Sequence, residues 1–332
     1  MPRIRILAVG LGPIGLAAVR LVLGRRTLEL AGAVDVDRDK RGKDLAELLG
    51  RPTPTGILVA DDAEAAYARL APDAVLLCTS SFLPAVREQV LLAVRHGADV
   101  VSSCEEMLLP DFQHPELAAE LDRAARQGGA TVVGTGVNPG FVLDFMPVVA
   151  SAVCSEVRRV RARRVVDAST RRLPLQKKVG AGMAEAEFRS LVAAGRLGHV
   201  GLRESVALVG RAFGFELDEV SQTVEPVLAT EERRTPHLAV PAGRVAGIRN
   251  VGVGRRGGEA LVELELEMYV GAPDAGDEIL LEGDPDVRVR FAGGVPGDEA
   301  TAAILVNTVP RAVEAAPGLR TVLDLAPARL VR

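Results

Sequence analysis

The glycine-rich segment 10–15, GLGPIG, constrains the fold of this chain more than any other feature. It follows the short apolar run 3–9 and opens the stretch 13–23, whose apolar residues have helical spacing. In such a GxGxxG turn the first glycine permits a tight bend, the second admits a pyrophosphate and the third lets helix and strand pack closely. The helix N-terminus then favours the anion. We therefore expect a dinucleotide to bind at Gly10, Gly12, Pro13, Ile14 and Gly15.

An acidic residue stands where the ribose of that dinucleotide would lie. Asp35 ends the second apolar run, 28–36, and a carboxylate at this place accepts hydrogen bonds from the adenosine ribose. Its charge favours NAD, because it repels the 2′-phosphate of NADP. The basic residues that follow can neutralise that phosphate, or they form a solvated helix start: Arg38, Lys40, Arg41 and Lys43. The sequence therefore leaves NAD and NADP both open as cofactors.

Buried strands and amphipathic helices alternate through the first half of the chain. Continuous apolar runs cover 73–78, 99–103 and 130–133, and amphipathic stretches cover 84–96 and 115–127. Strands of this kind belong to parallel sheets that are covered on both faces. We predict an α/β protein with a Rossmann-type, doubly wound parallel sheet.

The pattern changes after Cys154. Apolar and polar residues alternate over 260–269 and 287–291, which indicates antiparallel strands with one wet face. Helical segments are expected at 140–153, 184–194, 202–212 and 298–315. We predict an NAD(P)-binding domain at 1–150, an α+β substrate and oligomerisation domain with an open, mainly antiparallel sheet at 151–300, and a C-terminal helix and tail, 301–332, that return to the first domain.

Small polar and acidic side chains follow two of the buried runs, where parallel sheets bind their ligands. We expect cofactor contacts from Thr79, Ser80, Ser81, Ser103 and Cys104. Glu105 and Glu106 come next, and a carboxylate in a cleft can accept a proton from a substrate. Adjacent residues after a strand face opposite ways, so we expect only one of the two to be catalytic. Solvent-facing loop charges are the alternative interpretation.

Three further segments contain candidate site residues. The turn 134–141 includes an Asn-Pro-Gly sequence whose amides could face a nicotinamide, although a structural turn explains it equally well. The basic loop 171–182 could hold a carboxylate or be solvated, and the loop around His199 could reach the cleft or be structural. The candidates are Asn138 and Pro139 for the cofactor, and Phe141, Arg171, Gln176 and His199 for the substrate. We expect the substrate to lie between the domains, near Thr79, Glu105 and Asn138.

Composition excludes several classes of protein. The net charge of −4 and the absence of Trp argue against a nucleic-acid-binding surface. Three widely spaced cysteines form neither a disulfide framework nor a zinc pattern, so we expect no metal and a cytoplasmic location. Glycines and Pro13 interrupt the apolar N-terminal run, which argues against a membrane anchor. A sheet with one face that needs cover suggests a homodimer.

Several longer strings are more particular than the glycine motif. They are VDVDRDKRGKDLAELLG at 34–50, CTSSFL at 78–83, SSCEEMLLP at 102–110, GTGVNPGFVLD at 134–144 and RRLPLQKKVGAGM at 171–183. With these strings the chain resembles the dihydrodipicolinate-reductase-like dehydrogenases, a family that includes 2,4-diaminopentanoate dehydrogenase and the native amine dehydrogenases. The resemblance implies NAD(P)-dependent, reversible deamination of an amine to a ketone or aldehyde and ammonia. It also implies a glutamate that handles the amine.

The sequence differs at two places from related families of similar build. The His-His segment and PSGTA run of true dihydrodipicolinate reductases are absent. Sugar oxidoreductases of similar build carry a Lys at the place of Glu106. A homoserine-dehydrogenase-like or sugar-type alcohol oxidoreductase remains the enzyme alternative, and a non-catalytic redox sensor that binds dinucleotide is the other.

Overall fold

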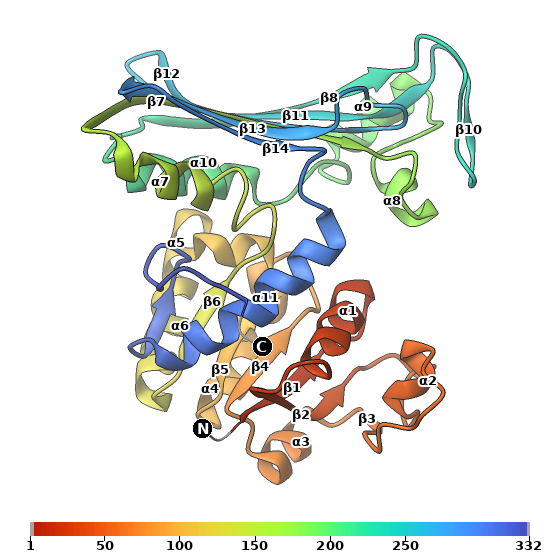
Figure 1. The fold of residues 1–332 in the computed structure, drawn as a ribbon, viewed down its shortest axis with the longest axis vertical. Helices are drawn as coiled ribbons and strands as arrows, with labels where there is room; N and C mark the ends of the chain where they lie inside the picture. The colour runs from red at the N-terminus through yellow and green to blue at the C-terminus, as the bar shows by residue number, and fades with distance from the viewer. Residues whose placement is uncertain (1–2, 331–332) are drawn as a thin grey trace. The chain divides into compact units, whose positions relative to one another are not determined.

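The computed structural model describes residues 3–330, which form two compact units (Figure 1). The first unit runs to Gly140 and resumes at Pro296, and the second spans Phe141–Val295. The first boundary therefore lies at 140 rather than at 150, because helix α7 (Phe145–Ala150) packs within the second unit. The chain re-enters the first unit at 296 rather than at 301, just before helix α11 (Gly297–Glu314).

A seven-stranded, wholly parallel sheet forms the centre of the first unit, in the order β15-β6-β5-β4-β1-β2-β3. The predicted Rossmann-type sheet is thus confirmed. Its central strands are buried on both faces, which explains their unbroken apolar sequences. The strands are β1 (Ile4–Val9), β2 (Leu28–Val34), β3 (Val59–Ala60), β4 (Ala74–Leu77), β5 (Asp99–Ser102), β6 (Thr131–Gly134) and β15 (Gly318–Arg320).

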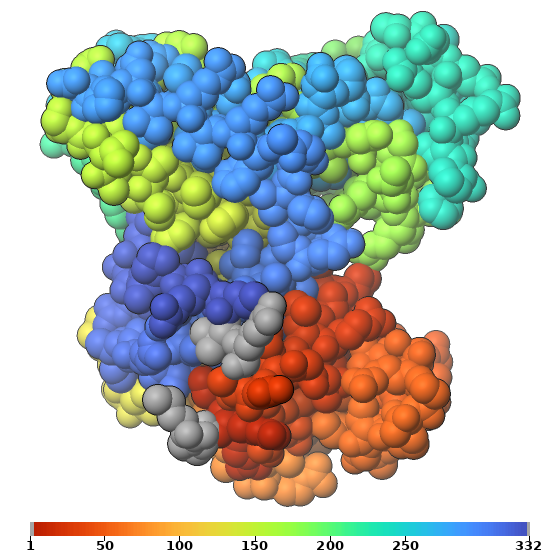
Figure 2. Space-filling model, in the orientation of Figure 1, coloured from red at the N-terminus to blue at the C-terminus, as the bar shows by residue number. Residues whose placement is uncertain are grey.

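Helices cover both faces of this parallel sheet. Helix α1 (Pro13–Val22) packs against α11, so that segments from the two ends of the chain lie side by side, red against blue in Figure 2. Apolar residues of α3 (Ala63–Leu70), α4 (Leu83–Arg95) and α6 (Pro115–Gly128) form one core cluster with the sheet. Shorter elements complete the unit: α2 (Leu45–Leu49), the 3-10 turn η1 (Glu105–Leu108) and α5 (Pro110–Gln113).

One carboxyl group at the amino-terminal edge of this sheet opposes folding at neutral pH. Burial raises the pKa of Asp99 to about 6, and the nearby charge of Asp73 adds to the effect, although the N–H of Thr131 donates to Asp99 Oδ1 at 2.6 Å. The folded state therefore holds this proton more tightly than the unfolded chain does. The contribution of this carboxyl to stability is therefore greatest below pH 4 and is lost as the pH rises through 6.

We expect Asp99→Asn to stabilise the protein at pH 8 by about 1–3 kcal/mol, because Asn keeps the acceptor for Thr131 without a charge. The gain should vanish near pH 4. Denaturant unfolding at both pH values measures it. Asp62→Asn at the exposed N-cap of α3 is the control, because Asn caps a helix as well as Asp does. An equal gain at pH 4 and pH 8 would contradict the assignment.

The second unit contains a six-stranded sheet in the order β14-β13-β7-β12-β11-β8. All neighbours are antiparallel except β7 and β12, so the sheet is mainly antiparallel, as predicted. The strands are β7 (Glu156–Asp167), β8 (Glu219–Leu228), β11 (Val245–Arg256), β12 (Glu259–Tyr269), β13 (Gly276–Asp284) and β14 (Val287–Ala292). A small separate pair, β9 (Arg233–Arg234) and β10 (Ala239–Val240), forms a hairpin arm.

Helices lie on one face of this second sheet: α7, α8 (Leu173–Lys178), α9 (Glu185–Ala193) and α10 (Leu202–Ala212) (Figure 1). Glycine makes the close packing possible, since a Cβ on Gly252 of β11 would lie 2.8 Å from the side chain of Val206 in α10. The helix expected at 140–153 is shorter, consisting of α7 and the 3-10 turn η2 (Ser151–Val153). Among the helices of residues 3–330, none has both the length and the apolar character to cross a membrane.

Candidate active site

The glycine turn joins β1 to α1 and has the shape of a pyrophosphate cradle. Gly10 has φ +87°, and a Cβ there would lie 2.5 Å from the carbonyl oxygen of Cys78. A Cβ on Gly15 would lie 1.9 Å from the carbonyl oxygen of Gly10. A Cβ on Gly12, in contrast, would meet no atom of the described chain within 4 Å. The middle glycine thus faces open space at an uncapped helix N-terminus, and the turn fits a bound dinucleotide.

Asp35 lies beside this turn and is held by three donors. Its Oδ2 accepts from the N–H of Leu11 at 2.6 Å and from Lys40 Nζ at 3.0 Å, and its Oδ1 accepts from the N–H of Asp37 at 2.9 Å. Burial raises the pKa of Asp35, but these hydrogen bonds outweigh it and hold the pKa below its usual value. Asp35 is therefore an anion that also fixes the glycine turn.

Lys40 forms an ion pair with Asp35, whereas the predicted cofactor residues Arg38 and Lys43 are exposed. All of these basic residues follow Asp35 closely in the sequence, so the sequence alone did not show which of them lies beside its carboxylate. The turns of backbone after β2 place Lys40 over Asp35 and Asp37, 3.0 and 3.3 Å from their carboxylate oxygens. Lys40 is thus the basic residue best placed to contact a phosphate group on the adenosine ribose.

Replacing Asp35 by Ser should raise the ratio of kcat/KM for NADP over NAD by roughly 10-fold or more, because the repulsion between the carboxylate and a 2′-phosphate disappears. Lys40 loses one of its two acidic partners, keeps Asp37, and can pair with that phosphate. Steady-state kinetics with both cofactors measure the ratio. Asp37→Ser is the control, since it leaves the bond from Leu11 to Asp35 intact. An unchanged ratio in the Asp35 variant would refute the ribose assignment.

The loop after β4 is tied to its neighbours by its own polar groups. The hydroxyl of Thr79 bonds to Gln89, Ser80 Oγ accepts from the N–H of Phe82, and the carbonyl oxygen of Ser81 accepts from the N–H of Glu106. Strands β1, β4 and β5 are adjacent and parallel, so the structure brings this loop, the glycine turn and η1 to the same edge of the sheet.

Ser103 and Cys104 lead from β5 into η1 but differ in exposure. Ser103 is half-buried, whereas the side chain of Cys104 lies in the hydrophobic core of the first unit, 1% exposed. Burial raises the pKa of the Cys104 thiol to about 12. The thiol thus packs with apolar residues, and a cofactor contact from Cys104 stays a prediction.

The paired glutamates differ in what they contact. Glu106 is buried, and its Oε2 accepts from the N–H of Leu83 at 2.7 Å and lies 3.1 Å from His114 Nε2. This carboxylate caps helix α4, where the helix dipole favours a negative charge. Glu105 is the more exposed of the two and begins η1. The expectation of solvent-facing loop charges does not hold for Glu106.

The turn after β6 is tightly closed on itself. A Cβ on Gly140, whose φ is +123°, would lie 2.4 Å from the backbone nitrogen of Gly136, so glycine is required there. The peptide between Asn138 and Pro139 is cis, and both residues lie at the carboxyl end of β6. The N–H of Thr135 donates to the carbonyl oxygen of Ser102, which joins this turn to the end of β5.

The four substrate candidates all belong to the second unit. Gln176 is fully buried, donates to the carbonyl oxygens of Ala168, Ser169 and Arg171, and accepts from the hydroxyl of Thr235. Its amide thus joins α8, the loop after β7 and the hairpin arm, and its role in substrate binding stays a prediction. The others are half-buried: Phe141 stacks on Phe145, Arg171 lies in the loop between β7 and α8, and His199 accepts from Gln222 through its carbonyl oxygen.

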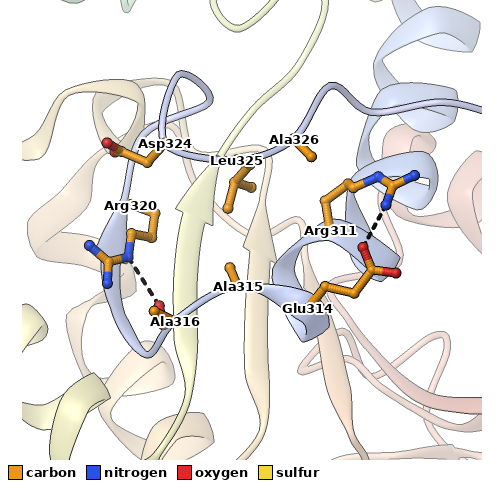
Figure 3. Close-up of a pocket in the computed structure, with 8 residues that line it drawn as sticks. All are labelled: Arg311, Glu314, Ala315, Ala316, Arg320, Asp324, Leu325 and Ala326. Atoms are coloured by element: carbon orange, nitrogen blue, oxygen red, sulfur yellow. Dashed lines mark hydrogen bonds and ion pairs between the residues drawn. The ribbon is translucent and has the colours of Figure 1, made fainter.

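A pocket of about 530 Å³ lies between the end of α11 and the segment after β15 (Figure 3). Its charged side chains are already engaged: Arg311 pairs with Glu314, Arg320 donates to the carbonyl oxygen of Ala316, and Asp324 accepts from Thr321. None of the predicted site residues lines it. The candidate site is thus the carboxyl edge of the parallel sheet and not this pocket.

Comparison with known proteins agrees with these features. A sequence model of the 2,4-diaminopentanoate dehydrogenase C-terminal domain matches residues 141–331. The chain is 33% identical to 2,4-diaminopentanoate dehydrogenase of Acetoanaerobium sticklandii, over 98% of this chain and 94% of that protein. The chain belongs to the 2,4-diaminopentanoate dehydrogenase family. The resemblance drawn from the sequence motifs is thereby confirmed.

This family member is also similar to two amine dehydrogenases over nearly the whole length of its chain. That of Streptomyces virginiae is 26% identical over 95% of this chain and 94% of its own. The structure of the amine dehydrogenase from Mycobacterium smegmatis superposes with a TM-score of 0.86 at 27% identity, covering 99% of this chain and 97% of that one. The two units described above therefore have the fold of that amine dehydrogenase.

Proposed function

We propose that the protein is an NAD(P)-dependent amine dehydrogenase, which oxidises an amine to a ketone or aldehyde and ammonia and runs in reverse as a reductive aminase. The observation that carries this proposal is a dinucleotide cradle beside a carboxylate-bearing turn on one edge of the sheet. Family membership supports it, since relatives are named 2,4-diaminopentanoate dehydrogenase and amine dehydrogenase. Gly10, Gly12 and Gly15 would hold the cofactor, with Asp35 at its ribose.

Glu105 is the residue that we propose to exchange a proton with the amine. Glu106 is buried and accepts from Leu83, whereas Glu105 is the more exposed of the two, so Glu105 is the more accessible to an amine. A free alkylamine is mostly protonated near neutral pH, and its nitrogen must lose a proton before the lone pair can assist hydride departure. When bound, the nicotinamide supplies the acceptor for that hydride. In the reverse direction a protonated Glu105 donates to the hydroxyl that leaves the carbinolamine as water.

A spectrophotometric screen tests the proposed activity. Ketones and aldehydes are offered with ammonia and either NADH or NADPH, and amines with either oxidised cofactor. We expect ammonia-dependent oxidation of the reduced cofactor. Turnover of alcohols without any turnover of amines would instead select the alcohol oxidoreductase. Cofactor binding without turnover of amines, ketones or alcohols would select the redox sensor.

We also propose that two copies associate through the sheet of the second unit. The helices of residues 141–295 lie on one of its faces, and the other carries alternating rows of Arg and Glu. Cross-strand ion pairs run through these rows, among them Arg163 with Glu267 and Arg249 with Glu265. Rows of both signs are self-complementary under a two-fold axis. Light scattering should give the mass of a dimer, and a monomeric mass would refute the proposal.

A cytoplasmic location is the setting that we propose for this activity. Cys78, Cys104 and Cys154 are all free thiols. Burial raises the pKa of Cys78 to about 11, so this thiol is a poor nucleophile for disulfide exchange. Fractionation of the source cells with an antibody tests the location, and recovery outside the cytoplasm would contradict it.

A further inference from the structure

Three segments of the first unit converge on Glu106, two of them on its carboxylate and one on its backbone N–H. The first is the N-terminus of α4, whose Leu83 N–H donates to Oε2. The second is the loop after β4, because the backbone N–H of Glu106 donates to the carbonyl oxygen of Ser81 at 3.2 Å. The third is the joint between α5 and α6, where His114 places Nε2 at 3.1 Å from the same Oε2.

These contacts fix the position of the 3-10 turn that begins with Glu105. A 3-10 helix of four residues has few hydrogen bonds of its own, so contacts from outside decide where it lies. On its inner side, Met107 packs against β6, since a Cβ on Gly134 would lie 2.5 Å from the Met107 carbonyl carbon. On its other side, Glu106 is the residue that connects η1 to α4 and His114.

We propose that Glu106 and His114 are a positioning pair, which holds η1 in the place where Glu105 meets the amine. This inference rests on the proposed function, because it assigns Glu105 as the base. With its proton on Nε2, His114 donates a hydrogen bond to the carboxylate of Glu106. Because this side chain is only 11% exposed, the carboxylate depends on His114 and on the N–H of Leu83 for its hydrogen bonds. Without that donor the carboxylate keeps a single bond to Leu83, and Glu106 is drawn towards solvent together with the turn.

A matched pair at the opposite end of helix α4 serves as the control. There His96 places Nε2 at 3.0 Å from Glu64 Oε1, and its side chain is 26% exposed against 29% for His114. His96 is the C-cap residue of α4, whereas Glu106 caps its N-terminus. His96→Phe and His114→Phe thus remove the same kind of bond from the two ends of one helix.

We expect His114→Phe to lower kcat for amine oxidation by about 10- to 100-fold, because a carboxylate displaced by an ångström loses its alignment. Its dissociation constant for NADH or NADPH, measured without amine, should stay unchanged. His114→Gln should restore kcat, since the Gln amide nitrogen occupies the place of Nε2. His96→Phe should keep the parental kcat, because its partner Glu64 is 66% exposed and remains solvated without the imidazole. All variants are assayed as the full-length protein.

Three outcomes would overturn the positioning pair. They are a parental kcat in His114→Phe, an equal loss of kcat in His96→Phe, and a failure of His114→Gln to restore kcat. Glu105→Gln, assayed beside them, separates this inference from the proposed function. If Glu105→Gln is inactive and His114→Phe is active, the pair alone is wrong. If Glu105→Gln is active, the assignment of the base is wrong, and with it the positioning pair.

Discussion

Replacing Glu105 by Gln should lower kcat for amine oxidation by roughly 10²–10⁴-fold, the usual contribution of a general base. Gln keeps the size of the side chain and removes its basicity. Because η1 begins at this residue and Glu106 anchors the turn, the change should leave the fold and the affinity for NADH intact. Initial rates at saturating amine, together with the fluorescence of bound NADH, measure the two effects.

Glu106→Gln is the comparison for that experiment. Its amide oxygen can still accept from Leu83, so it should lose less activity than Glu105→Gln, and its loss should accompany a lower melting temperature. A Glu106→Gln variant that is inactive, beside a Glu105→Gln variant at the parental rate, would reverse the roles of the two glutamates. Parental rates in both would refute the glutamate mechanism.

Gly12→Ala should weaken the binding of NAD and NADP by roughly 10- to 100-fold, the loss of one or two charge-assisted hydrogen bonds to a pyrophosphate. The new methyl group meets no atom of the described chain within 4 Å, so thermal stability should remain at the parental value. Titration of NADH fluorescence and a melting curve measure the two quantities. A dissociation constant equal to that of the parent would refute the cradle.

Two other glycines of the same helix region provide the controls for Gly12. Gly24→Ala places its Cβ at an ordinary 3.4 Å from the carbonyl oxygen of Leu21, and it should change neither stability nor binding. Gly15→Ala forces a Cβ to within 1.9 Å of the Gly10 carbonyl oxygen, and it should lower the melting temperature. The three variants therefore separate a defect in binding from a defect in folding.

Features that depend on local sequence were predicted well. The glycine turn, the parallel strands and helices α4, α6, α10 and α11 follow from apolar periodicity and turn residues that act over a few positions. Sequence likewise located the strand ends that meet at one edge, because all strands of a parallel sheet run the same way.

Features that depend on distant contacts were missed. The sequence shows Gln176 as part of a basic loop, but its burial is set by Ala168 and by Thr235 of the hairpin arm. Cys104 follows a strand, yet its side chain turns into the core. Nothing in the spacing links His114 to Glu106, since that contact requires α5 and α6 to fold back over η1. The burial and contacts of each of these residues depend on residues far away in the sequence, which the periodicity of the sequence does not identify.

The division of the first unit between the two ends of the chain has a consequence for folding. The first 140 residues leave the ribosome without α11, whose residues Leu305, Val306 and Val309 are fully buried, and without edge strand β15. The inserted second unit is continuous in sequence and can complete its core during synthesis. The parallel sheet gains its last strand and α11 only when the C-terminal residues emerge. The unit that is translated first is therefore the one that matures last.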